Sequence, residues 1–405
     1  MKRYFALFLC LVLLLSAVAC NGGGTAEGTT TESGAATTTD AATTLGGEEE
    51  TTTEGEEITT EPPEKTYEGV YPVVEAGEKY SNRVLNGTDD EVFHRVKADG
   101  RSYMTEKGIS IDWSASALEF QADCKGDLTV NLYASGGAVK FRAFLDGEEL
   151  GDDMFTIGGS GSITFPDLEE GTHTIRILRI TMVESGTKGV FGDLTSIDLN
   201  GVLMEKPADK AYYIEFLGDS VSCGVGTRPA DGYAYGDEAF PYQTAVALDV
   251  DYSVVSISGI GTMTGTSRHG SNNIYGTINW FNYYRSPKMQ YETDRQADVV
   301  VIATNANDHD QYGFDSCVRA IVNRMRDIHG DDTKFIWVFN MYNDKAAYNQ
   351  IVINEFERFG GEEAGFYTLE FFVNKVGGSE HPIGTAHDDY TELLVNFIQE
   401  KNILG

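Results

Sequence analysis

The hydrophobic pattern of this chain changes once, between Leu203 and Tyr212. Before the change, short runs alternate apolar and polar residues. After it, continuous apolar runs alternate with segments of helical periodicity. Alternation is typical of strands with one solvated face, whereas continuous apolar runs are typical of parallel strands that are covered on both faces. We therefore expect two different sheets, one after the other along the chain.

The first region, residues 67–206, is expected to form an antiparallel β-sandwich. Turn residues separate its short alternating runs, and no strong helix pattern lies between them. Asp146-Gly147 is a typical two-residue hairpin turn. The runs that we expect to be strands are Leu118–Ala122, Leu128–Leu132, Val139–Leu145, Thr174–Thr181 and Leu194–Leu199.

The second region, residues 207–405, is expected to form a three-layer α/β/α domain around a parallel sheet. Its strands are predicted at Tyr213–Leu217, Tyr252–Ile257, Val299–Ala303, Phe335–Phe339 and Gly365–Glu370. Its helices are predicted near Tyr242–Leu248, Phe314–His329, Ala346–Phe359 and Asp388–Ile398.

The amino terminus has the pattern of an export signal. Two basic residues precede an apolar run from Tyr4 to Ala19, which is too short for a spanning helix. The four residues that end at Cys20 resemble a bacterial lipobox, which implies cleavage before Cys20 and lipid attachment to its thiol. Plain secretion with cleavage after Ala19 is the alternative. We predict a lipoprotein signal peptide over residues 1–20 and a lipid-anchored protein at a bacterial cell surface, outside the cytoplasm.

Residues 21–66 form a low-complexity segment of Thr, Glu, Gly and Ala. It contains eleven acidic residues and one lysine, and almost no large apolar side chain. Such a segment cannot bury enough surface to offset the entropy of ordering it. We therefore predict a disordered linker between the membrane anchor and the folded domains.

The whole chain is strongly acidic, with a formal net charge of -33. A negative field of this kind repels nucleic acid and anionic lipid. The charge therefore excludes nucleic acid as a partner and leaves the lipid as the only expected tie to the membrane. It favours neutral substrates over anionic ones.

Polar residues that could form a hydrolytic site follow the ends of the predicted parallel strands. Ser220 comes directly after the first strand, Gly259 after the second and Asn307 after the third, while His381 precedes the last helix. The carboxyl ends of parallel strands meet at one edge of a sheet, where such folds place their chemistry. A serine needs a base, and the addition intermediate needs donors for its oxyanion. We assign Ser220 as nucleophile, His381 as base, and the Ser220 and Gly259 N–H groups with the Asn307 amide as oxyanion donors.

Other residues near these positions are secondary candidates, namely Asp219, Gly261 and Asp308. Each has a structural alternative, because turn and strand-end residues of these types are common. A metal site from Asp308, His309, Asp310 and His387 is conceivable, but the spacing is not that of a zinc site. We expect no metal and no cofactor. The remaining histidines, His94, His173, His269 and His329, are interpreted as surface or packing residues.

The motifs together resemble those of the SGNH (GDSL-type) hydrolases. The resemblance is carried by Gly218-Asp219-Ser220, Ser258-Gly259-Ile260-Gly261, Asn307-Asp308 and His381-Pro382. The preceding β-region, including the Asp146-Gly147 turn and the run from Gly171 to Arg176, resembles the amino-terminal jelly roll of carbohydrate esterase family 2. The resemblance covers about Val92 to the carboxyl terminus. It implies a jelly-roll domain followed by an SGNH hydrolase domain, and metal-free removal of O-acetyl groups from hemicellulose sugars.

Three residues depart from the pattern of these relatives. Asn305 stands where the superfamily usually has a glycine, which affects the pocket or the loop beside Asn307. Gly378 stands where many relatives have an acidic residue, three positions before His381. Glu380 replaces the aromatic residue that often precedes the histidine. The departures at Gly378 and Glu380 favour a Ser–His dyad over a triad.

The sequence predicts a surface-tethered serine esterase that removes acetyl groups from polysaccharides through an acyl-serine intermediate. Two alternatives remain. One is a glycan-binding lipoprotein whose catalytic site has degenerated. The other is a hydrolase of the same fold that acts on a lipid or a thioester.

Overall fold

A computed structural model of the chain describes residues 80–185, 188–229, 233–262, 282–283, 286–291, 293–304, 306–308, 311–339, 346–372, 376–377 and 380–405. The predicted signal peptide with Cys20, the predicted linker, His269, Asn305, His309, Asp310 and Gly378 lie outside the described residues. Within the described residues, no helix is both long and apolar enough to cross a membrane.

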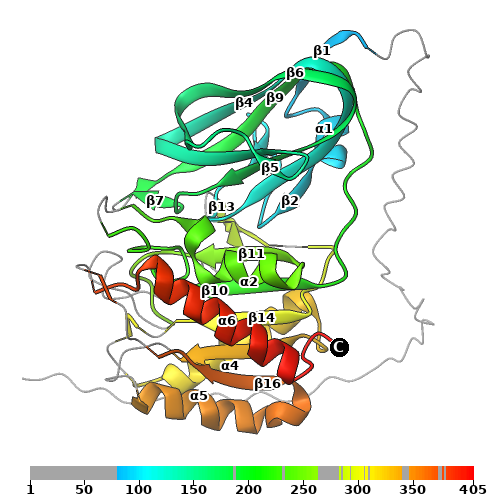
Figure 1. Cartoon of the computed structure of the whole chain (residues 1–405). Helices are drawn as coiled ribbons and strands as arrows, with labels where there is room; N and C mark the ends of the chain where they lie inside the picture. Colours follow the sequence, from blue (N-terminus) through cyan, green and yellow to red (C-terminus); the bar gives the residue numbers. More distant parts are fainter. Residues whose placement is uncertain are drawn as a thin grey trace, which may run out of the picture. The chain divides into compact units, whose positions relative to one another are not determined.

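An antiparallel sheet occupies the first half of the described chain (Figure 1). Its long strands β4, β6 and β9 bend so that the sheet curls over its own core, and the short helix α1 lies beside it. We call this part the β domain. Its elements are β1 (Asn82–Asn86), α1 (Asp90–Arg95), β2 (Lys97–Asp99), β3 (Ile109–Ser110), β4 (Ala117–Leu145), β5 (Glu148–Glu149), β6 (Phe155–Arg179) and β9 (Phe191–Leu203), with a small hairpin of β7 (Glu184–Ser185) and β8 (Lys188–Gly189).

Strand β4 differs from the sequence prediction. Three separate strands were expected where the structure has one element of 29 residues. The glycine-containing stretches within it, near Gly126 and Gly136, do not reverse the chain but shift the register of its pairing with β6. Extra residues of this kind act as β-bulges, which bend a strand without ending it. The predicted hairpin at Asp146-Gly147 is confirmed: it joins β4 to β5, and both residues have positive φ.

The core of the β domain follows the period-two pattern. Alternate residues of β4, such as Leu128, Val130 and Leu132, are at most 1 % exposed and pack against Ile163 and Phe165 of β6 within one cluster. The strand pairing shows a curled antiparallel sheet. The jelly-roll connectivity that the sequence indicates stays a prediction.

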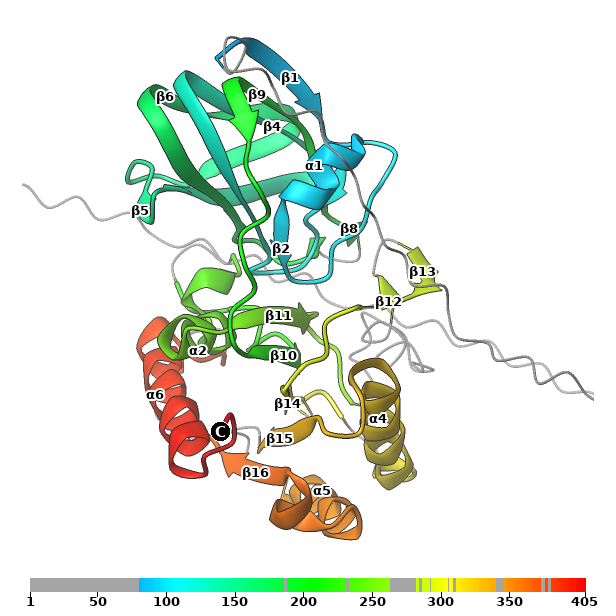
Figure 2. The ribbon, with the colours of Figure 1, turned by 90° about the vertical axis from the view of Figure 1, so that its right-hand side faces the viewer.

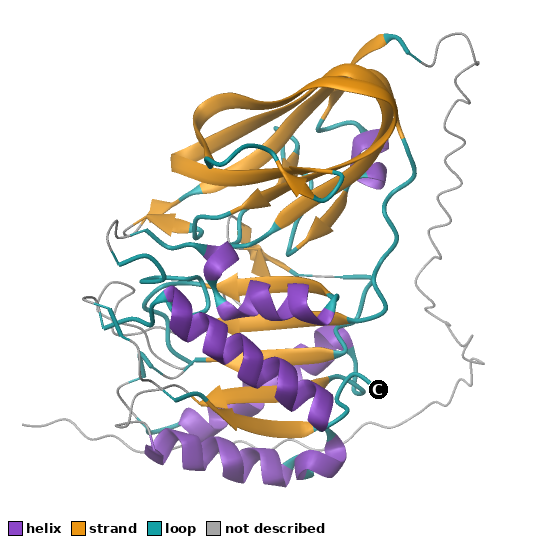
Figure 3. Cartoon of the chain, in the orientation of Figure 1, coloured by secondary structure: helices purple, strands orange, loops and turns teal. Residues whose placement is uncertain are grey.

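A parallel sheet of five strands, in the order β11-β10-β14-β15-β16, forms the centre of the second half. Helices α2 and α6 cover one face and α4 and α5 the other, which gives the predicted three layers (Figures 2 and 3). The strands are β10 (Tyr213–Gly218), β11 (Asp251–Ser256), β14 (Val299–Ala303), β15 (Lys334–Phe339) and β16 (Phe366–Glu370). The helices are α2 (Phe240–Leu248), α4 (Phe314–His329), α5 (Ala346–Arg358) and α6 (Gly384–Glu400), with short turns η1 (Gly236–Glu238) and η3 (Gly361–Ala364), and β12 (Asn282–Tyr283) pairs with β13 (Ser286–Gln290).

The strand order places β10 at a reversal point of the parallel sheet. From β10 the chain moves to β11 on one side and then to β14 on the other. Loops that leave neighbouring strands in opposite directions open a crevice at their carboxyl ends, and ligands bind there in open α/β sheets. Ser220 follows the end of β10, so the fold puts it at this crevice.

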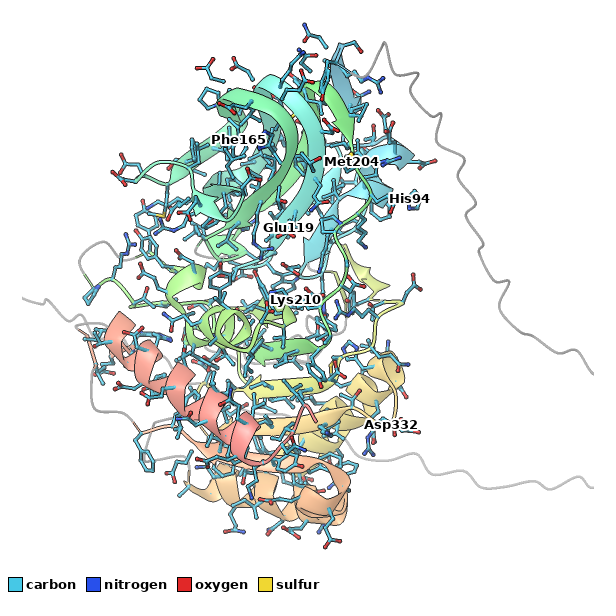
Figure 4. All side chains as sticks on the ribbon, turned by 45° about the vertical axis from the view of Figure 1, so that its right-hand side comes forward. His94, Glu119, Phe165, Met204, Lys210 and Asp332 are labelled. Atoms are coloured by element: carbon cyan, nitrogen blue, oxygen red, sulfur yellow. The ribbon has the colours of Figure 1, made fainter. Side chains whose placement is uncertain are left out.

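The β domain contacts the α/β domain along a polar seam. Arg176 of β6 bonds to Asp99 and Glu119 in its own domain, at 2.7 and 3.0 Å, and donates to the hydroxyl of Tyr252 in β11 at 3.1 Å. Lys97 of β2 is paired with Asp251 at 2.7 Å. Figure 4 labels Glu119 on the β-domain side of the seam and Lys210 on the other side. Several charged residues of both domains are thus paired along one seam.

Candidate active site

Ser220 lies on a tight turn directly after β10. Its carbonyl accepts the N–H of Val225 at 2.9 Å, and the carbonyl of Asp219 accepts the N–H of Cys223 at 3.2 Å. These bonds close the chain into one helical turn as soon as the strand ends. Ser220 itself is 6 % exposed. The turn therefore fixes the serine at the carboxyl edge of the sheet.

The side chains of Ser220 and His381 meet, although 161 residues separate them in the chain. Nε2 of His381 lies 2.9 Å from Oγ of Ser220, which is hydrogen-bonding distance. His381 is only partly buried, just before α6. Its carbonyl accepts the N–H of Gly377, and Pro382 forms a β-bridge with Val376. The imidazole is therefore aimed at the hydroxyl from a loop with backbone support.

Gly259 and Asn307 lie in the loops that follow β11 and β14. Gly259 has a φ of +83°, a conformation that a side chain would disfavour, so its backbone needs glycine. Nδ2 of Asn307 donates to the carbonyl of Ile260, one residue further on, at 2.8 Å. This bond ties the two loops together and uses one of the two amide hydrogens. The second hydrogen can donate to another acceptor, such as an oxyanion.

Two buried carboxyl groups lie beneath these loops. Oδ2 of Asp308 accepts the N–H of Thr262 at 2.7 Å, and Oδ1 of Asp219 accepts that of Val221 at 3.0 Å. Burial, and secondarily the charge of Asp308, raises the pKa of Asp219 to about 7. Both secondary candidates thus hold backbone of the site's loops. Gly261 is buried between Ile260 and Thr262.

His387, which the alternative metal site would require, has a structural environment. It is fully buried in α6, its ring stacks on Phe240, and its Nδ1 accepts the Phe240 N–H at 3.2 Å. Burial, with a smaller contribution from His381, lowers its pKa to about 3. Among the residues that the structure describes, no group of three or more His, Cys, Asp or Glu side chains could hold a metal ion.

The departure at Glu380 is visible next to the imidazole. Glu380 is exposed and has a φ of +61°. The departures at Asn305 and Gly378 lie outside the described residues. The other histidines for which the structure gives contacts are packing or surface residues. His173 is bonded to Asp146 of the hairpin at 2.8 Å, and His94 lies edge-on to Phe93.

Sequence reasoning missed a buried polar cluster on the same strand as Ser220. Glu215, in the middle of β10, accepts hydrogen bonds from Arg101 of the β domain at 3.0 Å and from His329 of α4 at 2.7 Å. All three side chains are fully buried. Burial alone would raise the pKa of Glu215, but Arg101 and then His329 outweigh it and lower that pKa to about 2. The signal was in the sequence, because an acidic residue inside an otherwise apolar strand requires a partner.

Comparisons with known proteins give similarity at the level of structure. No family model matches the chain, and no curated protein matches it. Among solved structures, it is similar to a family two carbohydrate esterase from Cellvibrio japonicus, with a TM-score of 0.67 and 17% identity over 80% of this chain and 99% of that one. A family two carbohydrate esterase from Clostridium thermocellum in complex with cellohexaose has a TM-score of 0.62 and 21% identity, over 76% and 98% of the chains.

An acetyl xylan esterase from the rumen bacterium Butyrivibrio proteoclasticus gives a TM-score of 0.63 and 17% identity, over 79% of this chain and 99% of that one. The similarity thus extends over nearly the whole length of each solved protein and includes both sheets. At these identities it establishes the fold. The chain has a three-layer α/β domain preceded by a curled antiparallel sheet, and it shares this fold with these esterases.

Proposed function

We propose that the protein is a serine esterase that removes O-acetyl groups from polysaccharides. The observation that carries this proposal is the 2.9 Å contact between Nε2 of His381 and Oγ of Ser220. It occurs at the carboxyl edge of the parallel sheet, next to the loops of Gly259 and Asn307. A hydroxyl paired with an imidazole beside amide donors is the arrangement that acyl transfer requires.

In the first half of the reaction, Oγ of Ser220 attacks the carbonyl carbon of the acetyl ester and passes its proton to Nε2 of His381. The carbonyl electron pair moves to the oxygen, and the N–H groups of Ser220 and Gly259 with the Asn307 amide stabilise the resulting oxyanion. The intermediate then collapses. The bond to the sugar oxygen breaks, that oxygen takes the proton from His381, and acetyl-Ser220 remains.

In the second half, a water molecule attacks the carbonyl carbon of acetyl-Ser220 and gives its proton to His381. Collapse of this second intermediate releases acetic acid, which ionises in water, and the proton on His381 returns to Oγ of Ser220. The serine and the imidazole end in their starting states. The cycle needs no oxidant, reductant or further group.

The fold and the charge support a neutral polysaccharide as substrate. One structural neighbour is described as an acetyl xylan esterase and another is solved with cellohexaose. The net charge of -33 disfavours anionic substrates. We further propose that lipid on Cys20 holds the enzyme at the bacterial cell surface, with residues 21–66 as a spacer. Radiolabelled palmitate incorporated by the wild type but not by Cys20→Ala would support this anchor, and equal labelling would contradict it.

The test of the activity is Ser220→Ala. Acetate release from acetylated xylan and hydrolysis of p-nitrophenyl acetate should both fall by at least about 10⁴-fold, because the nucleophile is lost. Circular dichroism and the thermal midpoint should stay those of the wild type, since the hydroxyl is at the edge of the core. A folded Ser220→Ala protein with wild-type turnover would exclude Ser220 as the nucleophile.

A second candidate is a glycan-binding protein without hydrolytic activity. It is favoured by Glu380, which stands exposed beside His381 where relatives often have an aromatic residue. A fluorophosphonate probe separates the two candidates, because it labels only an activated serine. Labelling of wild type but not of Ser220→Ala supports the esterase. Absence of labelling, together with measurable binding to xylan or cello-oligosaccharides, supports the binding protein. Turnover of acyl thioesters in place of acetylated glycans would identify the third class.

A further inference from the structure

One short segment touches Ser220's turn, the His381 loop and the β domain. It consists of residues 224–229 and 233–240, between the serine and the start of α2, and we call it the bridging segment. Its contacts with each of these three neighbours consist of specific hydrogen bonds. None of these contacts belongs to the reaction itself.

The first set of contacts holds the turn of the serine. Val225 donates its N–H to the carbonyl of Ser220 at 2.9 Å and forms a β-bridge with Ala234. Tyr235 donates its N–H to the carbonyl of Gly224 at 3.1 Å. The two halves of the bridging segment therefore pair with each other immediately behind the serine.

The second set of contacts holds the loop and helix that carry the imidazole. The carbonyl of Thr227 accepts the N–H of Gly384, the first residue of α6, at 2.9 Å. The N–H of Phe240 is bonded to His387 one turn further along α6. Since His381 lies three residues before Gly384, a shift of the bridging segment would move the imidazole as well as the hydroxyl.

The third set of contacts comes from the β domain. Nε of Arg142, on β4, donates to Oδ2 of Asp237 at 2.7 Å, and the same guanidinium pairs with Glu149 of β5. The carbonyl of Ile180 accepts the N–H of Gly236 at 3.0 Å, and Nζ of Lys140 donates to the hydroxyl of Tyr235 at 3.2 Å.

The fit between the β domain and the bridging segment is tight. A Cβ on Gly236 would lie 2.2 Å from Oγ of Ser114 and 2.8 Å from the N of Ala115. The side chains of Arg142 and Asp237 are 16% and 9% exposed. A charge-assisted bond that is largely shielded from water is stronger and more rigid than one at the surface. The segment therefore has a single place against the β domain.

We propose that the β domain positions the Ser220–His381 pair through this bridging segment, with Arg142 as the positioning residue. The inference rests on the proposed esterase function. Arg142 touches neither substrate nor the reacting atoms; it acts by fixing Asp237 and with it the segment that both reacting side chains depend on. Misplacing reacting groups by about 1 Å can cost roughly 10²-fold in rate. The domain is thus part of the catalytic framework.

The test compares two arginines of the same seam. Arg142→Gln removes the bond to the bridging segment, whereas Arg176→Gln removes a seam arginine that contacts β11 instead. With p-nitrophenyl acetate, which offers no sugar to bind, Arg142→Gln should lower kcat by about 10–100-fold with little change in KM. Arg176→Gln should lower the thermal midpoint and leave kcat unchanged. Arg142→Lys, which keeps the charge but loses the fork, should recover part of kcat.

Asp237→Asn tests the same tie from the other side with a smaller change, and it keeps the shape of the side chain. The proposal requires kcat to fall in this variant too, with a thermal midpoint close to that of wild type. A folded Arg142→Gln or Asp237→Asn protein with wild-type kcat would overturn the proposal. So would a rise in KM for acetylated xylan with unchanged kcat on both substrates, which would mean that the β domain binds sugar.

Failure of the positioning role can be told apart from failure of the proposed esterase function. If the wild type does not hydrolyse p-nitrophenyl acetate or react with the fluorophosphonate, the esterase proposal fails whatever Arg142 does. If the wild type is active and Ser220→Ala is not, the effect of Arg142→Gln bears only on the positioning role.

Discussion

Two imidazoles contact side chains of β10 and of the turn that follows it, and the two contacts differ in kind. Beyond the end of β10, the hydroxyl of Ser220 faces His381, which is only partly buried. In the middle of β10, the carboxylate of Glu215 faces His329, which is fully buried. His329 also accepts the N–H of Ala297 on Nδ1 at 3.2 Å, so its Nε2 carries the proton that it donates to Glu215.

The difference lies in what each imidazole can do with a proton. Both ring nitrogens of His329 are engaged by groups that do not react, one of which is a carboxylate already paired with Arg101. Burial without solvent access fixes this arrangement, and removing one partner would leave a buried polar group unpaired. His381 faces a neutral hydroxyl at a sheet edge and is itself partly exposed to solvent. An imidazole beside an acidic partner is therefore not by itself evidence of catalysis. Solvent access and the nature of the partner decide whether the imidazole can act as a base.

The largest expected effect tests directly whether the two histidines have separate roles. His381→Ala should lower kcat by about 10³-fold or more, because the base is lost, with little change in stability. His329→Ala should leave the kcat of the folded protein unchanged but reduce the free energy of unfolding by about 3 kcal/mol, because Glu215 loses a buried partner. Urea unfolding measures the free energy of unfolding, and p-nitrophenyl acetate turnover measures kcat. Equal loss of turnover in both variants would show that the two regions are not separate.

The proposed oxyanion donor Asn307 gives the next effect. Asn307→Ala should lower kcat by about 10²-fold through loss of one donor. Loss of its bond to Ile260 should reduce stability only slightly. A steady-state assay at saturating p-nitrophenyl acetate measures this. If only KM changed, Asn307 would bind substrate without stabilising the transition state.

Low pH should weaken the buried cluster of Glu215, Arg101 and His329. The pKa of Glu215 is about 2 in the folded protein, below its ordinary value of 4.5. Its contribution to stability is therefore fully present above about pH 4.5 and is lost as the pH falls toward 2, a difference of roughly 3 kcal/mol. Glu215→Gln should flatten the stability curve in this window. Urea midpoints between pH 2 and 7 test it, and parallel curves for the two proteins would contradict it.

A second pH effect, opposite in sign, concerns Asp219, which borders Ser220. Its pKa is raised to about 7, so the folded state binds the proton more tightly than the unfolded chain. Stability should therefore fall as the pH rises from about 4 to 7. Asp219→Asn should lessen this fall and keep the bond to Val221. Thermal midpoints at pH 5 and 8 measure it. From pH 5 to pH 8, the thermal midpoint of the wild type should fall relative to that of Asp219→Asn. A rise relative to Asp219→Asn would contradict the expectation.

Much of the α/β domain was predictable because buried parallel strands appear in the sequence as continuous apolar runs. Each of the five predicted strands agrees with the structure within about one residue, and the helix Phe314–His329 has the predicted bounds. The positions of Ser220 and Asn307 followed from where apolar runs end. In the β domain the prediction was coarser, since the glycines of β4 read as turns and only the pairing with β6 shows them to be bulges.

The sequence by itself determined the two kinds of sheet, the order of the elements and the side chains of the proposed reactive pair, because periodicity and strand ends are local properties. The tertiary structure decided that Ser220 and His381 meet, that Arg101 and His329 pair with the carboxylate of Glu215, and that Arg142 reaches Asp237. These contacts join residues from 95 to 161 positions apart. The packing of whole elements fixes them, and no pattern within a single element encodes that packing.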